Sequence, residues 1–192
     1  MIDMSLMGFE NLHYAKLTKD DSTGITYEAP KAFPGAISLN EEVQSETAKL
    51  YADNRLWESM EIYNESTIEL VVADLPADVV AELCGHSVDA TTGKITYNAN
   101  DNPPHFCIMG EFLKGDGTKR YFKLLKGKFS DAGLEGETKN ESPEFKTFTL
   151  NATFMPRQHD NNYKYVVDES STNSAYVAKW YDSVEDAAGG GG

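Results

Sequence analysis

Cysteine is scarce in this sequence, with Cys84 and Cys107 as the two thiols among 192 residues. The opening segment, Met1–Met7, already contains Asp3, so it lacks the basic and then apolar run of a secretory signal. No apolar run approaches the roughly 20 residues that a helix needs to cross a bilayer. These shortages argue against secretion and membrane insertion, and they predict a protein kept in a reducing cytoplasm with both thiols free.

Basic residues are also few. The chain has 17 Lys and Arg against 31 Asp and Glu, so its formal net charge is −14 on 21.2 kDa. Such a negative field keeps free subunits soluble and repels the phosphate backbone of nucleic acid. The charge argues against a DNA-binding domain, but it is compatible with a surface past which DNA slides.

The charge is unevenly distributed along the chain. Residues 41–101 hold 13 acids and three bases, whereas residues 102–128 hold six bases and two acids. The six bases are Lys114, Lys119, Arg120, Lys123, Lys126 and Lys128. They are either solubilising residues of a hairpin edge or a basic patch that meets an acidic surface of another subunit in a head-to-tail contact.

Signatures of catalysis are absent from the sequence. There is no glycine-rich phosphate loop, nucleophile elbow or metalloprotease motif, and the adjacent acids Asp20-Asp21 and Glu41-Glu42 diverge if they lie on strands. No cofactor is predicted, and the sequence indicates a protein that is not an enzyme.

One constellation has the chemistry of a zinc site. Cys84-x-His86 and His105-x-Cys107 together offer two thiolates and two imidazoles. The single-residue spacers differ from the two to four residues usual between zinc ligands. Cys84 also falls on the apolar face of a predicted helix, where a free cysteine commonly acts as a small hydrophobe. The sequence therefore favours core cysteines over a metal site.

Most of the chain has strand character. Strands are expected at 8–18, 36–43, 56–63, 67–72, 106–113, 121–125 and 145–155. Asp74 as a cap, Pro76 near the start and Gly85 at the end predict a helix at about 75–85, and apolar spacing predicts a second one at 174–184. Gly115-Asp116-Gly117 indicates a hairpin turn. The stretch at about 44–55 is too polar for a core strand, and we expect an extended loop there.

These elements predict an α+β class that is mainly β, with a two-sheet sandwich or partial barrel and one flanking helix. We expect one domain over residues 1–188, with an N-terminal arm, followed by a flexible glycine tail at 189–192.

Several segments, in order, carry a family likeness. They are Gly8-Phe9-Glu10-Asn11-Leu12-His13-Tyr14-Ala15, Phe33-Pro34-Gly35-Ala36-Ile37, Leu50-Tyr51-Ala52-Asp53-Asn54, Leu83-Cys84-Gly85-His86, Thr92-Gly93-Lys94, Gly127-Lys128-Phe129 and the Thr-rich strand at 145–154. By these segments the chain resembles the major tail proteins of long-tailed bacteriophages of Gram-positive bacteria.

The resemblance implies hexameric rings that stack head-to-tail into a tail tube, assembled in the host cytoplasm. It implies a tape measure protein and tail terminator and distal tail proteins as partners, and DNA that passes through the lumen without specific binding. It makes Leu50, Tyr51, Asp53 and Asn54 candidates for inter-ring contacts, although an ordinary surface loop would look the same. Glu65 and Glu69 lie opposite the apolar face of their strand and become lumen candidates, unless that face points outward.

Two alternatives stay open at this point. The chain could form the tube of a contractile phage tail or of a phage-tail-like bacteriocin. It could instead be a monomeric β-sandwich binding module, in which exposed aromatics stack on a ligand such as a glycan. Candidates for such stacking are Tyr14, Tyr27, Tyr51, Trp57 and Tyr63.

Overall fold

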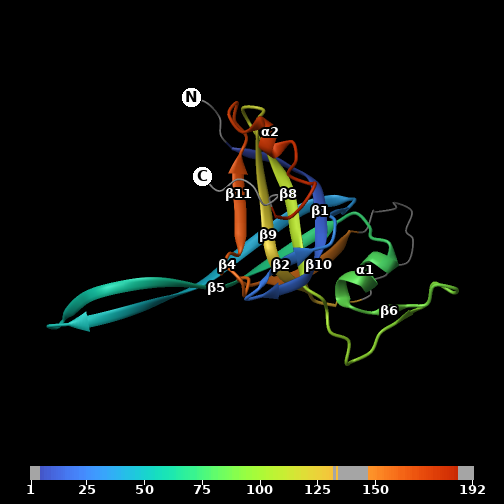
Figure 1. The fold of residues 1–192 in the computed structure, drawn as a ribbon, viewed down its shortest axis with the longest axis horizontal. Coiled ribbons are helices and arrows are strands. Elements are labelled where there is room, and N and C mark those ends of the chain that lie inside the picture. Colours follow the sequence, from blue (N-terminus) through green and yellow to red (C-terminus); the bar gives the residue numbers. More distant parts are fainter. Residues whose placement is uncertain (1–4, 132, 134–146, 186–192) are drawn as a thin grey trace, which may run out of the picture.

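A large antiparallel sheet dominates the computed structural model, which describes residues 5–131, 133 and 147–185 (Figure 1). Along the sheet the strands run in the order β2 (Gly24–Tyr27), β1 (Leu6–Asp21), β8 (Phe106–Lys114), β9 (Lys119–Phe129), β10 (Phe148–Phe154), β5 (Arg55–Val72) and β4 (Ala36–Ala52). Two further strands join this path: β3 (Lys31–Ala32) pairs with β1, and β11 (Lys164–Asp168) pairs with β9. A separate small sheet holds β6 (Ser87–Val88) and β7 (Ile95–Thr96).

The sheet curls so that its two halves share one core. β1 and β4, which are far apart in the strand order, approach each other, but the sheet does not close into a barrel. Leu12 and Tyr14 of β1 belong to the same buried cluster as Ile68 and Leu70 of β5. The predicted mainly-β, α+β class is therefore confirmed, in the form of one curled sheet with a small second sheet.

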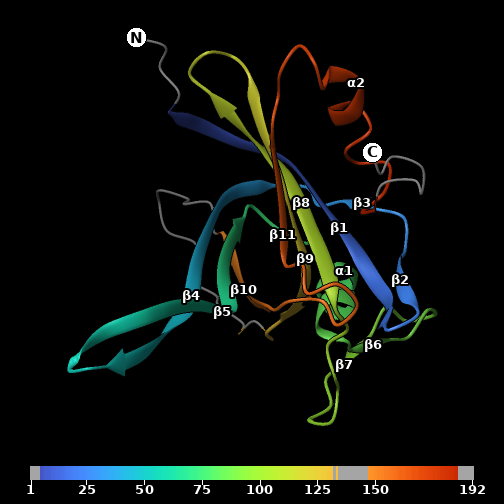
Figure 2. The ribbon, with the colours of Figure 1, turned by 60° about the vertical axis from the view of Figure 1, so that its left-hand side comes forward.

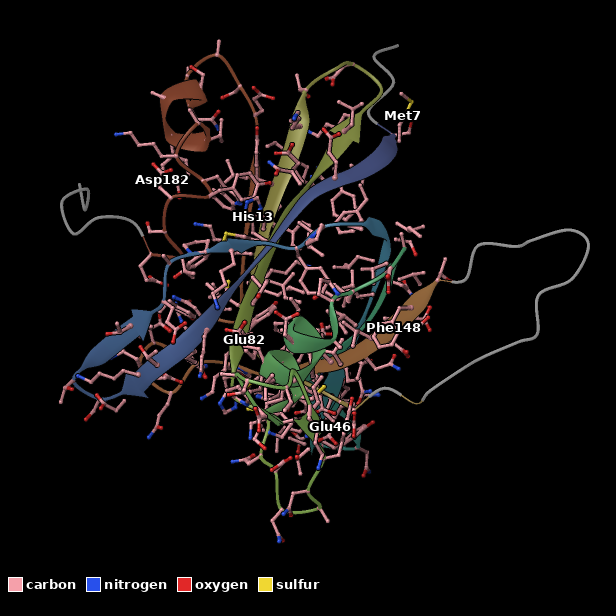
Figure 3. The ribbon with its side chains drawn as sticks, turned by 90° about the vertical axis from the view of Figure 1, so that its right-hand side faces the viewer. Met7, His13, Glu46, Glu82, Phe148 and Asp182 are labelled. Carbon is pink, nitrogen blue, oxygen red and sulfur yellow. The ribbon has the colours of Figure 1, made fainter. Side chains whose placement is uncertain are left out.

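Helix α1 (Ala77–Cys84) covers one face of this core (Figure 3). Its Val80, Leu83 and Cys84 are buried in the large cluster. The helix ends where predicted, because Gly85 adopts the left-handed conformation that commonly closes a helix, with φ of 76°. The expected cap by Asp74 is not formed, since its Oδ1 accepts a hydrogen bond from the adjacent N–H of Leu75.

The C-terminal segment covers the other face of β8 and β9. Alternate residues of β8 face opposite sides, so Cys107 and Met109 pack with Val184 while Phe106 and Ile108 enter the large cluster. Helix α2 (Ser174–Val177) is much shorter than the predicted helix over 174–184. The remaining residues form successive tight turns, with N–H of Trp180 bonded to the carbonyl of Val177 and N–H of Asp182 to that of Lys179.

Other expected elements agree with the structure. The turn at Gly115-Asp116-Gly117 joins β8 and β9, and β10 presents Leu150, Ala152 and Phe154 to the core. The predicted glycine tail at 189–192 and the first residues of the predicted strand at 145–155 lie outside the described residues. The polar stretch at about 44–55 is the exception: it is a long hairpin and not an irregular loop.

Candidate assembly surfaces

The hairpin of β4 and β5 extends far beyond the rest of the subunit (Figures 1 and 2). A two-residue turn, Asp53-Asn54, joins the strands, and both turn residues have positive φ, 50° and 59°. This is the turn geometry that matches the twist of paired strands, and Asp and Asn tolerate it better than most residues. The sequence forms a hairpin here because each strand satisfies the backbone hydrogen bonds of the other without needing a buried face.

We call residues 42–62 of this hairpin the arm. All of its residues are exposed except Ala52, which is half-buried. The arm nevertheless carries seven of the fourteen exposed large hydrophobic side chains among the described residues. These seven are Val43, Leu50, Tyr51, Leu56, Trp57, Met60 and Ile62. Where such side chains gather on one face, the exposed apolar surface commonly marks an interaction site.

The pairing of the strands shows which of these side chains share a face. Ala48 lies opposite Met60, Glu46 opposite Ile62, and Leu50 opposite Glu58. Since alternate residues of β4 point to the same side, Leu50, Met60 and Ile62 gather on one face of the arm.

The predicted inter-ring residues all lie at the end of the arm. Leu50 and Tyr51 are the last large side chains of the outgoing strand, 56% and 65% exposed, and Asp53 and Asn54 form the turn. The returning strand was predicted at 56–63, but Trp57 on it was named only as a ligand-stacking candidate and not as a contact between subunits. Trp57 is 59% exposed and lies under the guanidinium of Arg55 at 5.5 Å. The Asp-Asn pair between two runs with apolar residues was the available signal for a hairpin.

The predicted lumen residues lie on a polar face formed by three strands. Glu69 sits between Asn40 of β4 and Asn151 of β10, and Glu65 lies opposite Gln44. Glu69 is exposed and Glu65 half-buried, while Ile68, Leu70 and Val72 point into the core as the alternation predicts. A hollow of about 380 Å³ on this face includes Asn40, Glu42, Thr67 and Glu69 in its lining.

Over residues 38–44 of β4 and the positions paired with them, this face carries three carboxylates, those of Glu42, Glu65 and Glu69, and its other positions are neutral. The next cation by register is Lys128 of β9, which lies opposite Thr153 and donates a hydrogen bond to Asn102 at 2.8 Å. We call this stretch, formed by residues 38–44 of β4, 65–71 of β5 and 149–153 of β10, the acidic face.

The six bases at 114–128 do not form a free patch on the subunit. Lys128 contacts Asn102, as described above, and the other five contact acidic or carbonyl groups of the same chain. Lys114 and Arg120 both bind Asp168, Lys119 binds Glu10 and Glu111, and Lys126 binds Asp20. Lys123 is buried, donates to the carbonyls of Ser183 and Val184, and lies 4.3 Å from the centre of the Trp180 ring.

These contacts lower the pKa values of two of their carboxylate partners. Hydrogen bonds from Arg120 and then Lys114 hold the pKa of Asp168 far below its usual range. Burial alone would raise the pKa of Asp20, but the N–H of Gln158 and the ammonium of Lys126 lower it. The cations therefore hold the subunit together, and we do not assign them to a contact between subunits.

The two predicted Cys-His pairs lie in different places. Burial raises the pKa of both thiols, and Cys107 belongs to the cluster under the C-terminal segment while Cys84 belongs to the large core. Among the described residues, Cys84 and His86 lie together with Asp131, and neither His105 nor Cys107 belongs to that group.

Comparison with known protein families identifies a match over most of the chain. A family model described as phage tail tube protein matches residues 18–185. No curated protein matches the chain significantly. None of the helices in the described part of the chain is both long enough and apolar enough to cross a membrane.

Proposed function

The chain belongs to the phage tail tube protein family, and from this we propose that it assembles into hexameric rings that stack into the tube of the virion tail. The protein is a structural component of the tail, and its work is assembly and not catalysis. We further propose that assembly takes place in the host cytoplasm around a tape measure protein, with terminator and distal tail proteins closing the two ends.

The observation that carries this proposal is the arm. A free subunit leaves Leu50, Trp57, Met60 and Ile62 in water on a hairpin that projects from the sheet. Full burial of side chains of this size is favourable by about 1.5–3 kcal/mol each. A surface that covered the arm would therefore bind it firmly.

We propose that a second copy of the chain, in the adjacent ring, provides this covering surface. The arm is one patch and its receiving surface is another, so the contact is heterologous. Heterologous contacts repeat from copy to copy and grow into rings or helical stacks instead of stopping at a dimer. The arm is thus suited to joining successive rings along a tube.

We propose that the acidic face lines the lumen. Duplex DNA carries one negative charge per about 1.7 Å of its axis, and a wall rich in Lys or Arg would hold it. Glu42, Glu65 and Glu69 repel the phosphates, while Asn40, Thr67, Asn151 and Thr153 are neutral. DNA would then pass along such a wall without stopping.

Charge reversal tests the lumen assignment. We expect Glu65→Lys/Glu69→Lys particles to release DNA several-fold more slowly than unaltered particles, because new cations bind the phosphates. The delay should shrink at high salt, which screens such contacts. The measurement is the time course of DNA release from purified particles triggered in vitro.

The matched control reverses the charge of two acidic residues that lie outside the acidic face. Glu28 and Asp182 are exposed and lie outside the acidic face, so Glu28→Lys/Asp182→Lys particles should release DNA at the unaltered rate. Normal release from the Glu65→Lys/Glu69→Lys particles would remove these residues from the lumen.

Electron microscopy of the purified, overexpressed chain tests the proposed function itself. Rings or tubes in negative stain, with a matching large mass in solution, are expected. A chain that stays monomeric over a wide range of concentration and salt would instead support a monomeric binding module.

A further inference from the structure

A compact group of metal-ligating side chains lies at the end of α1, away from the arm. The Sγ of Cys84, a ring nitrogen of His86 and a carboxylate oxygen of Asp131 all lie within 4.8 Å of one another. Cys84 is the last residue of α1, His86 follows the helix-ending Gly85, and Asp131 comes just after β9. The Sγ of Cys84 also lies 3.7 Å from the carbonyl oxygen of Ser130, so the helix end and the strand end meet here.

Gly85 makes this meeting possible. Its φ of 76° turns the chain sharply after Cys84, and a Cβ at this position would lie 2.7 Å from the carbonyl oxygen of Asn102. Only a glycine can therefore bring His86 back beside Cys84 while the 102–103 backbone packs against the turn.

His86 has one nitrogen without a hydrogen bond. Its side chain is only 6% exposed, and its Nδ1 lies 2.7 Å from Oδ2 of Asp101. The same Oδ2 accepts the N–H of Asn98, which fixes the carboxylate. The Nε2 atom is buried and has no hydrogen-bond partner among the described residues.

The Nε2 atom of His86 faces the carboxylate of Asp131, which is part of the same cluster of ligating side chains. It lies 3.5 Å from Oδ1 of Asp131, a distance too long for a good hydrogen bond. Such an arrangement has a familiar counterpart in metalloproteins, where a ligating histidine usually donates its other N–H to a carboxylate that orients the ring. Asp101 has the position of that orienting carboxylate.

We propose that Cys84, His86 and Asp131 form a binding site for a zinc-class divalent transition metal. The donors are a thiolate sulfur, an imidazole nitrogen and a carboxylate oxygen, all of which zinc accepts in tetrahedral geometry. Asp131 is 56% exposed, so the site opens to solvent on its side and water supplies the fourth ligand. Tetrahedral ligands sit roughly 3.5 Å apart, so the side chains close in by about an ångström on binding.

The metal would fasten α1 to the end of β9. This role concerns the subunit's own fold and is independent of the arm and of tube formation. A competing arrangement without metal is a protonated His86 held between Asp101 and Asp131. The two arrangements can be told apart by spectroscopy, because only the metal site contains a bond between the Cys84 thiolate and a metal ion.

Cobalt and zinc titrations of the full chain decide between them. The reduced protein is stripped with a chelator, and Co²⁺ is added while the sulfur-to-cobalt charge-transfer band is recorded; Zn²⁺ is then titrated against a competing chelator. We expect one Co²⁺ per chain with a thiolate band that Zn²⁺ abolishes. Cys84→Ala should lose the band, and Asp131→Asn, an exposed change that spares the core, should weaken Zn²⁺ binding at least about tenfold.

Two further variants complete the design. Cys107→Ala removes the other thiol and should leave the band unchanged. Asp101→Asn should keep the band but weaken zinc binding about 10–100-fold, as expected for a positioning residue. The proposal is overturned if unaltered protein shows no thiolate band, or if it binds Zn²⁺ no more tightly than Asp131→Asn does.

Discussion

A subunit with Trp57→Ser, Met60→Ser and Ile62→Ser should fold normally and fail to form tubes. The three side chains are 59%, 59% and 45% exposed, so the free subunit loses little when they change. Exposed substitutions usually alter folding stability by no more than about 0.5 kcal/mol each. Assembly, however, would lose roughly 2–5 kcal/mol per arm if the tube covers these side chains, because about half of each is already out of water in the free subunit. Each 1.4 kcal/mol corresponds to about a tenfold change in affinity, so tubes should disappear at ordinary protein concentrations.

A conservative set of changes on the same arm is the control for this experiment. Trp57→Phe, Met60→Leu and Ile62→Val keep the apolar surface, and this variant should still assemble. Negative-stain microscopy and sedimentation report assembly, and circular dichroism with thermal unfolding reports the fold. Tubes of normal length from the triple serine variant would show that the arm does not join the rings.

Loss of Arg157 should destabilise the subunit more than any exposed substitution. The Arg157 side chain is fully buried and donates to Tyr165 at 2.6 Å, to both carboxylate oxygens of Asp160 and to Glu185. Removing one partner of a buried ion pair typically costs about 3–5 kcal/mol. Arg157→Ala should therefore lower the melting temperature of the free subunit by roughly 10 °C or more.

Two comparisons make this prediction specific. Arg157→Lys keeps the charge but not the forked donor geometry, so we expect an intermediate melting temperature. Lys179→Ala changes an exposed cation of the same C-terminal region and should have almost no effect. A melting temperature for Arg157→Ala close to that of Lys179→Ala would contradict the proposed role.

Acid should reduce the difference between the unaltered protein and Arg157→Ala. Burial alone would raise the pKa of Asp160, but the hydrogen bonds and charge of Arg157 lower it below that of an unfolded aspartate. Stability from a carboxyl with a lowered pKa is present above the unfolded pKa and is lost as the pH falls through the folded one. Unfolding free energies measured from neutral to acidic pH should therefore converge for the two proteins.

Elements with local signals were predictable from the sequence. Pro76 and Gly85 bracket α1, Gly115-Asp116-Gly117 marks the β8–β9 turn, and alternation identifies β10, because each signal acts within a few residues. The sequence could not predict that the six bases at 114–128 contact groups of their own chain. Lys126 and Asp20, for example, are far apart in the chain and meet only in the folded sheet.

The outgoing strand of the arm, expected as a loop at about 44–55, escaped prediction for a different reason. Neither of its faces is buried in its own subunit, so the sequence shows no single apolar alternation. Two bulges add to this: the partners of β4 shift by one residue at Asn64 and again at Trp57, which changes the face of the residues that follow. The proposed metal site was partly predictable, since Cys84 and His86 are close in sequence, but Asp131 is too distant in sequence to be recognised as their neighbour.

The arm links the family assignment to a physical mechanism. A tail tube needs a contact that repeats along its axis, and the subunit projects an apolar hairpin that its own core does not use. The acidic face lies on the same side of the hairpin as Leu50, Met60 and Ile62, by the alternation of β4. Joining rings and lining a lumen would thus fall to adjoining parts of one sheet.

Cryo-electron microscopy of tubes formed by the unaltered chain tests the central claim most directly. We expect a map in which each arm lies against a subunit of the adjacent ring, with Leu50, Met60 and Ile62 covered by that subunit. A map in which the rings stack through other surfaces while the arms stand free in solvent would contradict the account.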